Sequence, residues 1–261
     1  MKNILQKLIR GTHVALCCQD LPEKLAIYFH SIDQSEIGAF METISYFLEQ
    51  GYEFCDPNAF CVQQSSRAIF LSFDDNHRSW LEIAEILRRY GVRATFYVNT
   101  CVLHSRCAAS EIAAYYDRIA SYRARTPLSA TDIAHLVAAG HILGSHGRSH
   151  QMLTRLPLPQ AREEIRQGKA ELEDLLGTPV LHFSFPYGMR RHFCEKLRSY
   201  CFELGFRTVA SAIPGMQHCR QTAACIYRSP WRLGKSREYN LDNLRVDGTF
   251  FERLTGRSAV G

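Results

Sequence analysis

Residues 68–75 read Ala68-Ile69-Phe70-Leu71-Ser72-Phe73-Asp74-Asp75, an apolar run that ends in two carboxylates. A short, nearly uninterrupted apolar run is consistent with a strand that is buried on both faces, as strands of a parallel sheet are. An acidic pair after a strand is often only a turn. In parallel barrels, however, active sites lie at the carboxyl ends of the strands. The stretch therefore predicts a buried parallel strand with a candidate site at its end.

The same alternation of a short apolar run and a helical periodicity recurs along the chain. Seven predicted strands cover residues 25–29, 68–73, 92–98, 141–145, 180–185, 206–210 and 224–228. Predicted helices cover residues 36–50, 80–90, 129–140, 160–176 and 193–203, and most of them end at a glycine. Because no linker or change of composition interrupts this order, we expect an α/β fold, a single distorted (β/α)7-type barrel with parallel strands.

The expected domain is a single one that spans residues 1–261, with its core at about 25–230. Residues 103–127 break the regular pattern and predict an inserted helix, 110–124, at the rim of the barrel. From Trp231 onward the pattern fades, and we expect a loosely ordered tail.

Composition limits the classes of partner. The charge balance of 31 − 26 leaves a formal net charge of +5 without a dense basic run, which argues against nucleic acid. No secretory signal or membrane-spanning run is evident in the sequence. The ten cysteines include no C-x-x-C pair, which fits reduced thiols rather than disulfides. We therefore expect a cytoplasmic protein. Residues 2–10 predict a short basic amphipathic helix. This helix either packs on the domain or rests peripherally on a membrane surface. The oligomeric state stays open.

Polar residues follow five of the predicted strands at the point where each strand ends. They are His30, the pair Asp74 and Asp75, His146, the segment Pro186-Tyr187-Gly188, and Arg228. Because the carboxyl ends of parallel strands meet at one rim of a barrel, we expect these residues to lie together.

A second motif suggests what they do there. Residues 145–150 read Ser145-His146-Gly147-Arg148-Ser149-His150. Two histidines four residues apart can direct both imidazoles at one ion, although such a pair alone is more often surface chemistry. A carboxylate of the 74–75 pair would complete three protein ligands around one open position, as in catalytic zinc sites. The other carboxylate could then serve as a general base, so the two motifs together predict metal-assisted hydrolysis.

Taken in order, these motifs resemble those of the polysaccharide deacetylase family, carbohydrate esterase family four. The family's Asp-Asp motif after a strand is similar to residues 71–75, and its His-x-x-x-His motif, with a serine before each histidine, to residues 145–150. Its third motif ends in Pro-Tyr-Gly, as residues 185–188 do. The resemblance covers roughly residues 26–228 and is nearest to the poly-N-acetylglucosamine deacetylase-like branch.

The resemblance implies a role for each matched residue. Asp74 is the expected general base. The expected ligands of one divalent ion, zinc before any other, are Asp75, His146 and His150. In the poly-N-acetylglucosamine branch a motif on the first strand supplies the general acid, and Tyr28-Phe29-His30-Ser31-Ile32 looks similar to it. This similarity nominates His30, for which the alternative is a structural histidine at a strand end.

The chain departs from the family pattern in three places. Asn76 stands where the family usually has glycine, and asparagine tolerates the positive φ of a turn. Ser184 stands where the third motif commonly begins with an arginine that holds the base. We expect Arg228 to take over that contact, the alternative being a plain surface or structural arginine. No late apolar strand ends in a histidine, where many members keep their acid, and this absence favours His30.

The reaction implied by the resemblance is removal of an N-acetyl group from an amino sugar in a glycan or in a lipid-linked or nucleotide-linked saccharide. Metal and base would activate the water, an N–H near Tyr187 would help to stabilise the oxyanion, and His30 would protonate the leaving amine. The expected substrate-binding residues are Pro186, Tyr187 and Trp231. The last two could stack on a sugar ring, unless they are core aromatics.

Two other interpretations stay open. One is a related amidase or deformylase that acts on a small amide, and the other is a non-catalytic glycan-binding barrel. The intact acidic pair and histidines argue against the second, because a binding module needs no base beside a metal. We expect His77, two residues beyond Asp75, to turn outward rather than to bind the ion. No G-x-S-x-G motif or complete P-loop is present.

Overall fold

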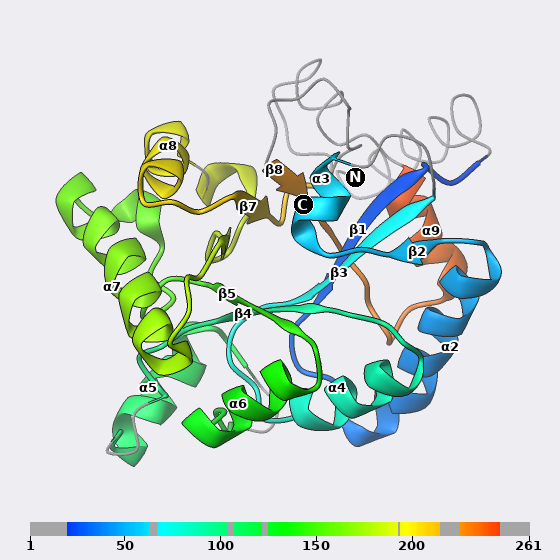
Figure 1. Cartoon of the computed structure of the whole chain (residues 1–261), viewed down its shortest axis with the longest axis horizontal. Coiled ribbons are helices and arrows are strands. Elements are labelled where there is room, and N and C mark those ends of the chain that lie inside the picture. The colour runs from blue at the N-terminus through cyan, green and yellow to red at the C-terminus, as the bar shows by residue number, and fades with distance from the viewer. Residues whose placement is uncertain are drawn as a thin grey trace, which may run out of the picture.

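A ring of parallel strands forms the centre of the structure, with helices around its outside (Figure 1). The computed structural model describes residues 20–62, 67–103, 107–121, 125–192, 194–214 and 225–245. The strands are β1 (Lys24–Phe29), β2 (Glu53–Phe54), β3 (Ala68–Phe73), β4 (Thr95–Val98), β5 (Ile142–Ser145), β6 (His182–Ser184), β7 (Thr208–Ser211), β8 (Cys225–Tyr227) and β9 (Ser229–Pro230). The helices are α2 (Ile37–Glu49), α3 (Pro57–Val62), α4 (Trp80–Arg89), α5 (Ala109–Arg118), α6 (Ala130–Ala138), α7 (Leu158–Leu176), α8 (Glu195–Glu203) and α9 (Arg237–Arg245). The described residues also include the short 3-10 helices η1 (Gln34–Glu36), η2 (Leu153–Arg155) and η3 (Arg190–His192).

The described strands pair in parallel in the order β8-β7-β6-β5-β4-β3-β1-β9, and β2 adds to β3. Only Arg228 separates β8 from β9. This one segment therefore pairs with β7 through its first part and with β1 through its second part. It closes the ring between the first and last strands, so the prediction of a distorted (β/α)7-type barrel is confirmed.

The 68–75 stretch lies in this ring as expected, and all six residues of β3 are buried. Ile69, Leu71 and Phe73 belong to the large apolar cluster between strands and helices, whereas Ala68 and Phe70 belong to a smaller cluster with residues of the neighbouring strands. This alternation follows from the two-residue period of a strand. Both faces are covered, which explains why the run is apolar throughout.

Two predicted segments differ from the structure. The inserted helix, α5, runs over Ala109–Arg118 and ends at a turn in which Ala120 has a φ of 51°, so it is shorter than predicted. The expectation of a loosely ordered tail after Trp231 was wrong for residues 237–245, which form α9. Leu241 and Leu244 of α9 are buried against the core. This stripe is too narrow to give a clear helical periodicity.

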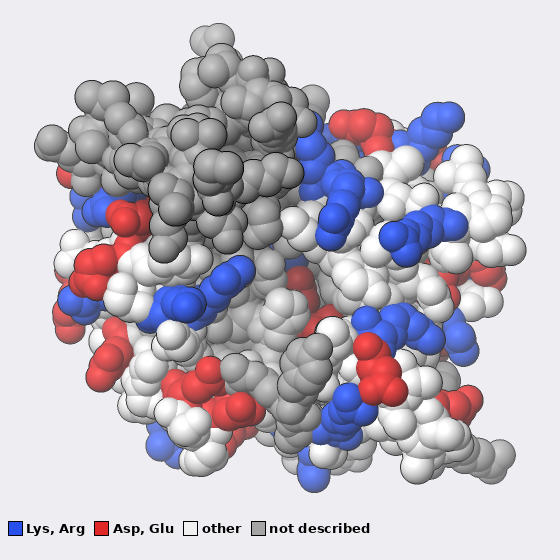
Figure 2. All heavy atoms as spheres, turned by 180° about the vertical axis from the view of Figure 1, so that it is seen from behind, with Lys and Arg blue, Asp and Glu red and all other residues white. Residues whose placement is uncertain are grey.

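Lysine and arginine side chains are interspersed with aspartate and glutamate on the face seen in Figure 2. No helix in the described part of the chain is long and apolar enough to cross a membrane. The amphipathic helix predicted at residues 2–10 lies outside the described residues. The cytoplasmic location stays a prediction.

Candidate metal centre and active site

The three expected metal ligands come from two loops, the first ligand loop (residues 74–77) after β3 and the second ligand loop (residues 146–150) after β5. Asp75 follows Asp74 at the end of β3, and His146 follows β5 directly, with His150 four residues later. The φ values of Asp75 and His150 are 84° and 54°. Positive φ is unfavourable for residues other than glycine, and such strained positions cluster at functional sites. The surrounding structure therefore has to hold both loops in place.

These loops bring the ligand atoms of Asp75, His146 and His150 within 4.8 Å of one another, and all three residues are buried. Oδ1 of Asp75 lies 3.2 Å from Nε2 of His150 and 3.7 Å from Nε2 of His146. Zinc–ligand distances of about 2.0–2.2 Å put neighbouring ligand atoms of a tetrahedral shell roughly 3.3–3.6 Å apart. The spacing is therefore close to that of a three-ligand zinc site.

The electrostatics of this cluster also suit a cation. Oδ1 of Asp75 is buried and has no hydrogen-bond partner among the described residues, an arrangement that costs free energy unless a cation satisfies it. Nδ1 of His146 lies 2.8 Å from the carbonyl oxygen of Ser184. Because a carbonyl only accepts, Nδ1 carries the proton and Nε2 keeps its lone pair for a metal. Burial lowers the pKa of His146 to about 4, so the ring is neutral at pH 7. The donor set fits a divalent ion.

Asp74 has a different partner. Nη1 and Nη2 of Arg228 donate to its two carboxylate oxygens, each at 2.7 Å. Burial alone would raise the pKa of Asp74, but the adjoining Arg228 guanidinium outweighs this and holds it below its ordinary value. Asp74 is therefore ionised at neutral pH, and the bidentate contact fixes its orientation.

Arg228 is itself completely buried, at the point where the barrel closes. Its Nε donates to the backbone carbonyl of Ser211. In addition to their bonds to Asp74, Nη1 donates to the hydroxyl of Ser72 and Nη2 donates to the hydroxyl of Ser184. The rings of Tyr28 and Tyr97 lie 4.8 and 5.3 Å from its guanidinium carbon. All five N–H groups are used, and the small side chain at position 184 leaves room for them.

His30 lies at the open side of the cluster. Its side chain is 54% exposed, and its Nε2 is 4.0 Å from Oδ2 of Asp75. The indole N–H of Trp80 donates to the carbonyl of His30 at 2.9 Å and fixes the backbone there. A solvent-accessible imidazole beside the expected metal ligands is in a suitable place to exchange protons with a substrate.

His77 does not turn outward as expected from the sequence. It is 2% exposed, and its Nε2 lies 3.7 Å from Oδ2 of Asp75. The Nε2 of His30 lies near the same oxygen. The ring of His77 packs against Trp80 and Tyr116, with centroids 6.1 and 5.7 Å away. Tyr116 belongs to α5, and a contact across that distance in sequence leaves no mark on the local pattern.

The structure separates the three expected substrate-binding residues. The ring of Tyr187 lies 4.5 Å from that of His150, and Pro186 is buried beside Gly147. Trp231, in contrast, is 6% exposed and packs in the hydrophobic core with its ring 5.2 Å from Phe47. Its side chain does not line the metal centre, because the backbone of Trp231 pairs with β1 and α2 covers the ring.

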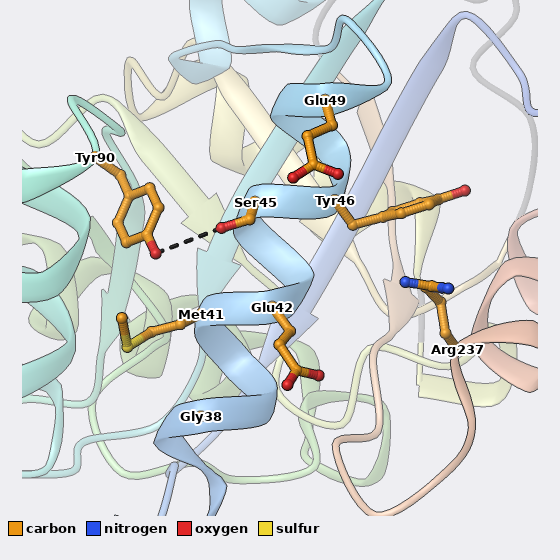
Figure 3. A pocket seen from close by; sticks show the side chains of 8 residues that line it. All are labelled: Gly38, Met41, Glu42, Ser45, Tyr46, Glu49, Tyr90 and Arg237. Carbon is orange, nitrogen blue, oxygen red and sulfur yellow. Dashed lines mark hydrogen bonds between the residues drawn. The ribbon is translucent and has the colours of Figure 1, made fainter.

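An open groove of about 460 Å³ lies elsewhere, on the outer side of α2 (Figure 3). Ser45 donates to the hydroxyl of Tyr90 across it, and the guanidinium of Arg237 lies 4.8 Å from the ring centre of Tyr46. None of the described residues that line this groove belongs to the metal centre.

Sequence reasoning missed the residues that hold the ligand loops. The hydroxyl and backbone N–H of Ser149 both donate to Glu164 of α7, and Arg148 donates to Glu171. Asn76 is fully buried and does not itself adopt positive φ, which falls on Asp75 instead. The acidic residues Glu164 and Glu171 are visible in the predicted helix 160–176, but only the fold shows that they contact the second ligand loop.

Comparisons with known proteins indicate the family and the fold of the chain. The sequence model of a family described as polysaccharide deacetylase matches residues 62–209, more than half of the chain. No curated protein sequence matches significantly. The structure is similar to the deacetylase PplD of Streptococcus pyogenes, with a TM-score of 0.67, 15% identity and coverage of 85% of this chain and 98% of that one. IcaB of Ammonifex degensii gives 0.67, 17% identity and 87% and 99% coverage.

The deacetylase domain of BpsB from Bordetella bronchiseptica has a TM-score of 0.62 at 14% identity and covers 81% of this chain and 97% of that one. At such identities the three structures support the fold. The family match covers the first ligand loop, the second ligand loop and the Pro-Tyr-Gly segment together. The chain therefore belongs to the polysaccharide deacetylase family.

Proposed function

We propose that this chain is a zinc-dependent hydrolase that removes the acetyl group from an N-acetylated amino sugar in a glycan or in a lipid-linked or nucleotide-linked saccharide. Membership of the family supports de-N-acetylation of an amino sugar. The single observation that carries the assignment of roles is the position of Asp74. This carboxylate is ionised, and both of its oxygens accept hydrogen bonds from Arg228. It is adjacent to the candidate metal ligands in sequence but is not one of them.

Asp75, His146 and His150 would hold the ion. When bound, a divalent metal of this kind supplies Lewis acidity toward the amide carbonyl and makes a nearby water more acidic. With these three residues as its protein ligands, the ion would keep a coordination position for water or substrate.

The residues of the chain then divide the proton transfers. Asp74 accepts a proton from the attacking water, and Arg228 keeps the accepting oxygen in place. His30 in its protonated form gives a proton to the leaving nitrogen as the C–N bond breaks, so that acetate and a neutral amine are released. An acid is needed because an amide anion is a very poor leaving group. Tyr187 lies beside His150, where it can contact the acetamido group.

A glycan-binding barrel without activity would not need this arrangement. Burying a carboxylate beside an arginine is costly, and a simple apolar contact in the same place is often as stable. Groups with strongly shifted pKa values in one cluster are instead typical of catalytic sites.

The test is an assay of acetate and free amine released from N-acetylglucosamine oligomers. The purified protein is compared with protein stripped by a chelator and with stripped protein reloaded with zinc. We expect equal amounts of acetate and amine, loss of activity on stripping, and recovery with zinc. Formate release from a formylated sugar without acetate release would indicate a deformylase, and activity that survives stripping would refute metal dependence.

A further inference from the structure

Helix α5, Ala109–Arg118, is the insertion whose role the family resemblance does not explain. It packs over a small apolar cluster of its own, in which Val102, Tyr115 and Tyr116 are the buried members. Both tyrosine hydroxyls, however, point at polar groups outside this cluster. They reach two of the loops that carry the metal centre.

The first contact runs from Tyr115 to Asn99, in the loop after β4, and through it to the loop after β5. Its hydroxyl donates to Oδ1 of Asn99 at 2.9 Å. Nδ2 of Asn99 in turn donates to the carbonyl of His146 at 2.6 Å and to that of Gly147 at 3.2 Å. Tyr115 thus orients the amide that holds the backbone of a metal ligand.

The second contact runs from Tyr116 to the loop after β3. Its hydroxyl donates to the carbonyl of Asn76 at 2.8 Å, next to the metal ligand Asp75. Nδ2 of Asn76 donates to the carbonyl of Asn99 at 3.1 Å, and its Oδ1 accepts from the N–H of Leu128 at 2.7 Å. The asparagine that stands where the family usually has glycine therefore connects the first ligand loop to Asn99, which in turn holds the second ligand loop.

A third contact comes from the end of the same helix. Nη1 of Arg118 donates to the carbonyl of Ser149 at 2.5 Å, and the carbonyl of Arg118 accepts from the hydroxyl of Tyr187 at 3.2 Å. One ten-residue helix thus contacts the loops after β3, β4, β5 and β6.

These contacts meet a need that the backbone creates. Asp75 and His150 hold strained, positive φ values, and strained loops persist only where the surroundings overdetermine them. Tyr115, Tyr116, Asn76 and Asn99 are all essentially buried, so no water competes for their hydrogen bonds. Burial also raises the pKa of both tyrosines, and their hydroxyls remain donors at neutral pH.

We infer that α5 is a brace for the metal centre, in which Tyr115 and Tyr116 are positioning residues that hold the two ligand loops in register through Asn99 and Asn76. The effect on metal binding rests on the proposed function, whereas the effect on the loops does not. Residues that orient metal ligands in this way typically change metal affinity by about 10- to 100-fold when they are replaced.

The test compares Tyr115→Phe, Tyr116→Phe and the double variant with Tyr52→Phe. Each change removes only a hydroxyl. Tyr52 is a matched control, because it is 2% exposed and its hydroxyl donates to the carbonyl of Pro22 at 2.7 Å, away from the ligand loops. Two quantities are measured: amide hydrogen exchange of residues 74–77 and 145–150 in metal-free protein, and zinc affinity by competition with a chelator.

In the tyrosine variants of α5 we expect faster exchange in these two loops and zinc affinity lower by about 10-fold or more, with little change in Tyr52→Phe. The single variants give the answer if the double variant does not fold. Exchange and zinc affinity equal to those of the wild type would overturn the inference, as would a uniform rise in exchange that Tyr52→Phe shares. Wild-type protein that binds zinc but releases no acetate would contradict the proposed function alone.

Discussion

At the scale of single residues, Arg228 fixes the orientation of Asp74, the proposed base, through both of its carboxylate oxygens. Family members commonly hold the base with an arginine at the position of Ser184. Here the guanidinium comes from Arg228, which lies between β8 and β9 where the barrel closes. The departure at Ser184 was visible in the sequence, and the placement of Arg228 at a strand end suggested the replacement. Its contact with Asp74 depends on closure of the barrel, which no local pattern contains.

This relocation can be tested by exchanging the two residues. Arg228→Ser should destabilise the fold by about 3–5 kcal/mol, because it leaves a buried carboxylate without its partner. It should also lower kcat at least about 100-fold, since an unoriented base contributes little. Adding Ser184→Arg returns a guanidinium next to Asp74 and should restore part of both losses, measured by urea unfolding and by acetate release. A folded double variant that is no more active than Arg228→Ser would contradict this account.

The role of His30 can be separated from that of Asp74 by the choice of leaving group. His30→Ala should lower kcat toward an N-acetylated sugar by about 100-fold or more, because the amine leaves only when protonated. The same variant should hydrolyse 4-nitrophenyl acetate nearly as fast as the wild type, since that phenolate leaves without an acid. Asp74→Asn serves as the control and should lose both activities. Equal losses on both substrates in His30→Ala would exclude His30 as the acid.

At the scale of elements, helix α7 supports the second ligand loop by direct contact. A Cβ on Gly168 would lie 2.5 Å from the carbonyl carbon of Gly147 and 2.7 Å from the amide nitrogen of Arg148. Both contacts are with backbone, which cannot move without displacing His146. Glycine at this position in the middle of a helix is therefore explained by the close approach of the loop.

Gly168→Ala should accordingly destabilise the protein by about 1–3 kcal/mol and weaken zinc binding. The matched control is Gly38→Ala on α2, where an added Cβ meets no atom within 4 Å. That variant should be neutral or more stable by up to about 1 kcal/mol. Urea unfolding and zinc competition measure both effects, and unchanged zinc affinity in Gly168→Ala would show that the loop does not depend on this contact.

The sequence was informative for those elements whose pattern is set by local burial. The run at 68–73 is apolar because both faces of β3 are covered, so the strand can be recognised from the sequence alone. The helix α9 escaped prediction because Leu241 and Leu244 are its only aliphatic residues, so its sequence shows no apolar face that repeats over several turns. His77 and Trp231 were misplaced for a related reason: Tyr116 and Phe47, which cover them, lie far away in the chain.

At the scale of the whole molecule, several buried histidines make stability depend on pH. His182 is 5% exposed, with Nδ1 2.9 Å from the hydroxyl of Thr208. Burial lowers the pKa of His182 to about 4 from an ordinary 6.5. The unfolded chain therefore binds this proton between about pH 6.5 and 4 while the folded chain does not, so stability falls as the pH falls through that window.

For His182 alone, this difference amounts to about 2 kcal/mol of unfolding free energy between pH 7 and pH 5. His182→Gln should reduce the loss of stability over that range, measured by urea unfolding at each pH, although other buried histidines such as His141 keep part of it. His135→Gln, which replaces an exposed histidine of α6, is the control. A slope in His182→Gln as steep as that of the wild type would show that this ring is not buried in its neutral form.

The central claim is that the two adjacent carboxylates have separate functions, one in binding the metal and one in accepting the proton. The most direct measurement is the zinc content of purified Asp74→Asn together with its rate of acetate release from N-acetylglucosamine oligomers, beside Asp75→Asn. The account predicts one zinc per chain in Asp74→Asn with kcat lowered at least about 100-fold, and loss of both zinc and activity in Asp75→Asn. Loss of zinc from a folded Asp74→Asn, or wild-type activity in it, would contradict the claim.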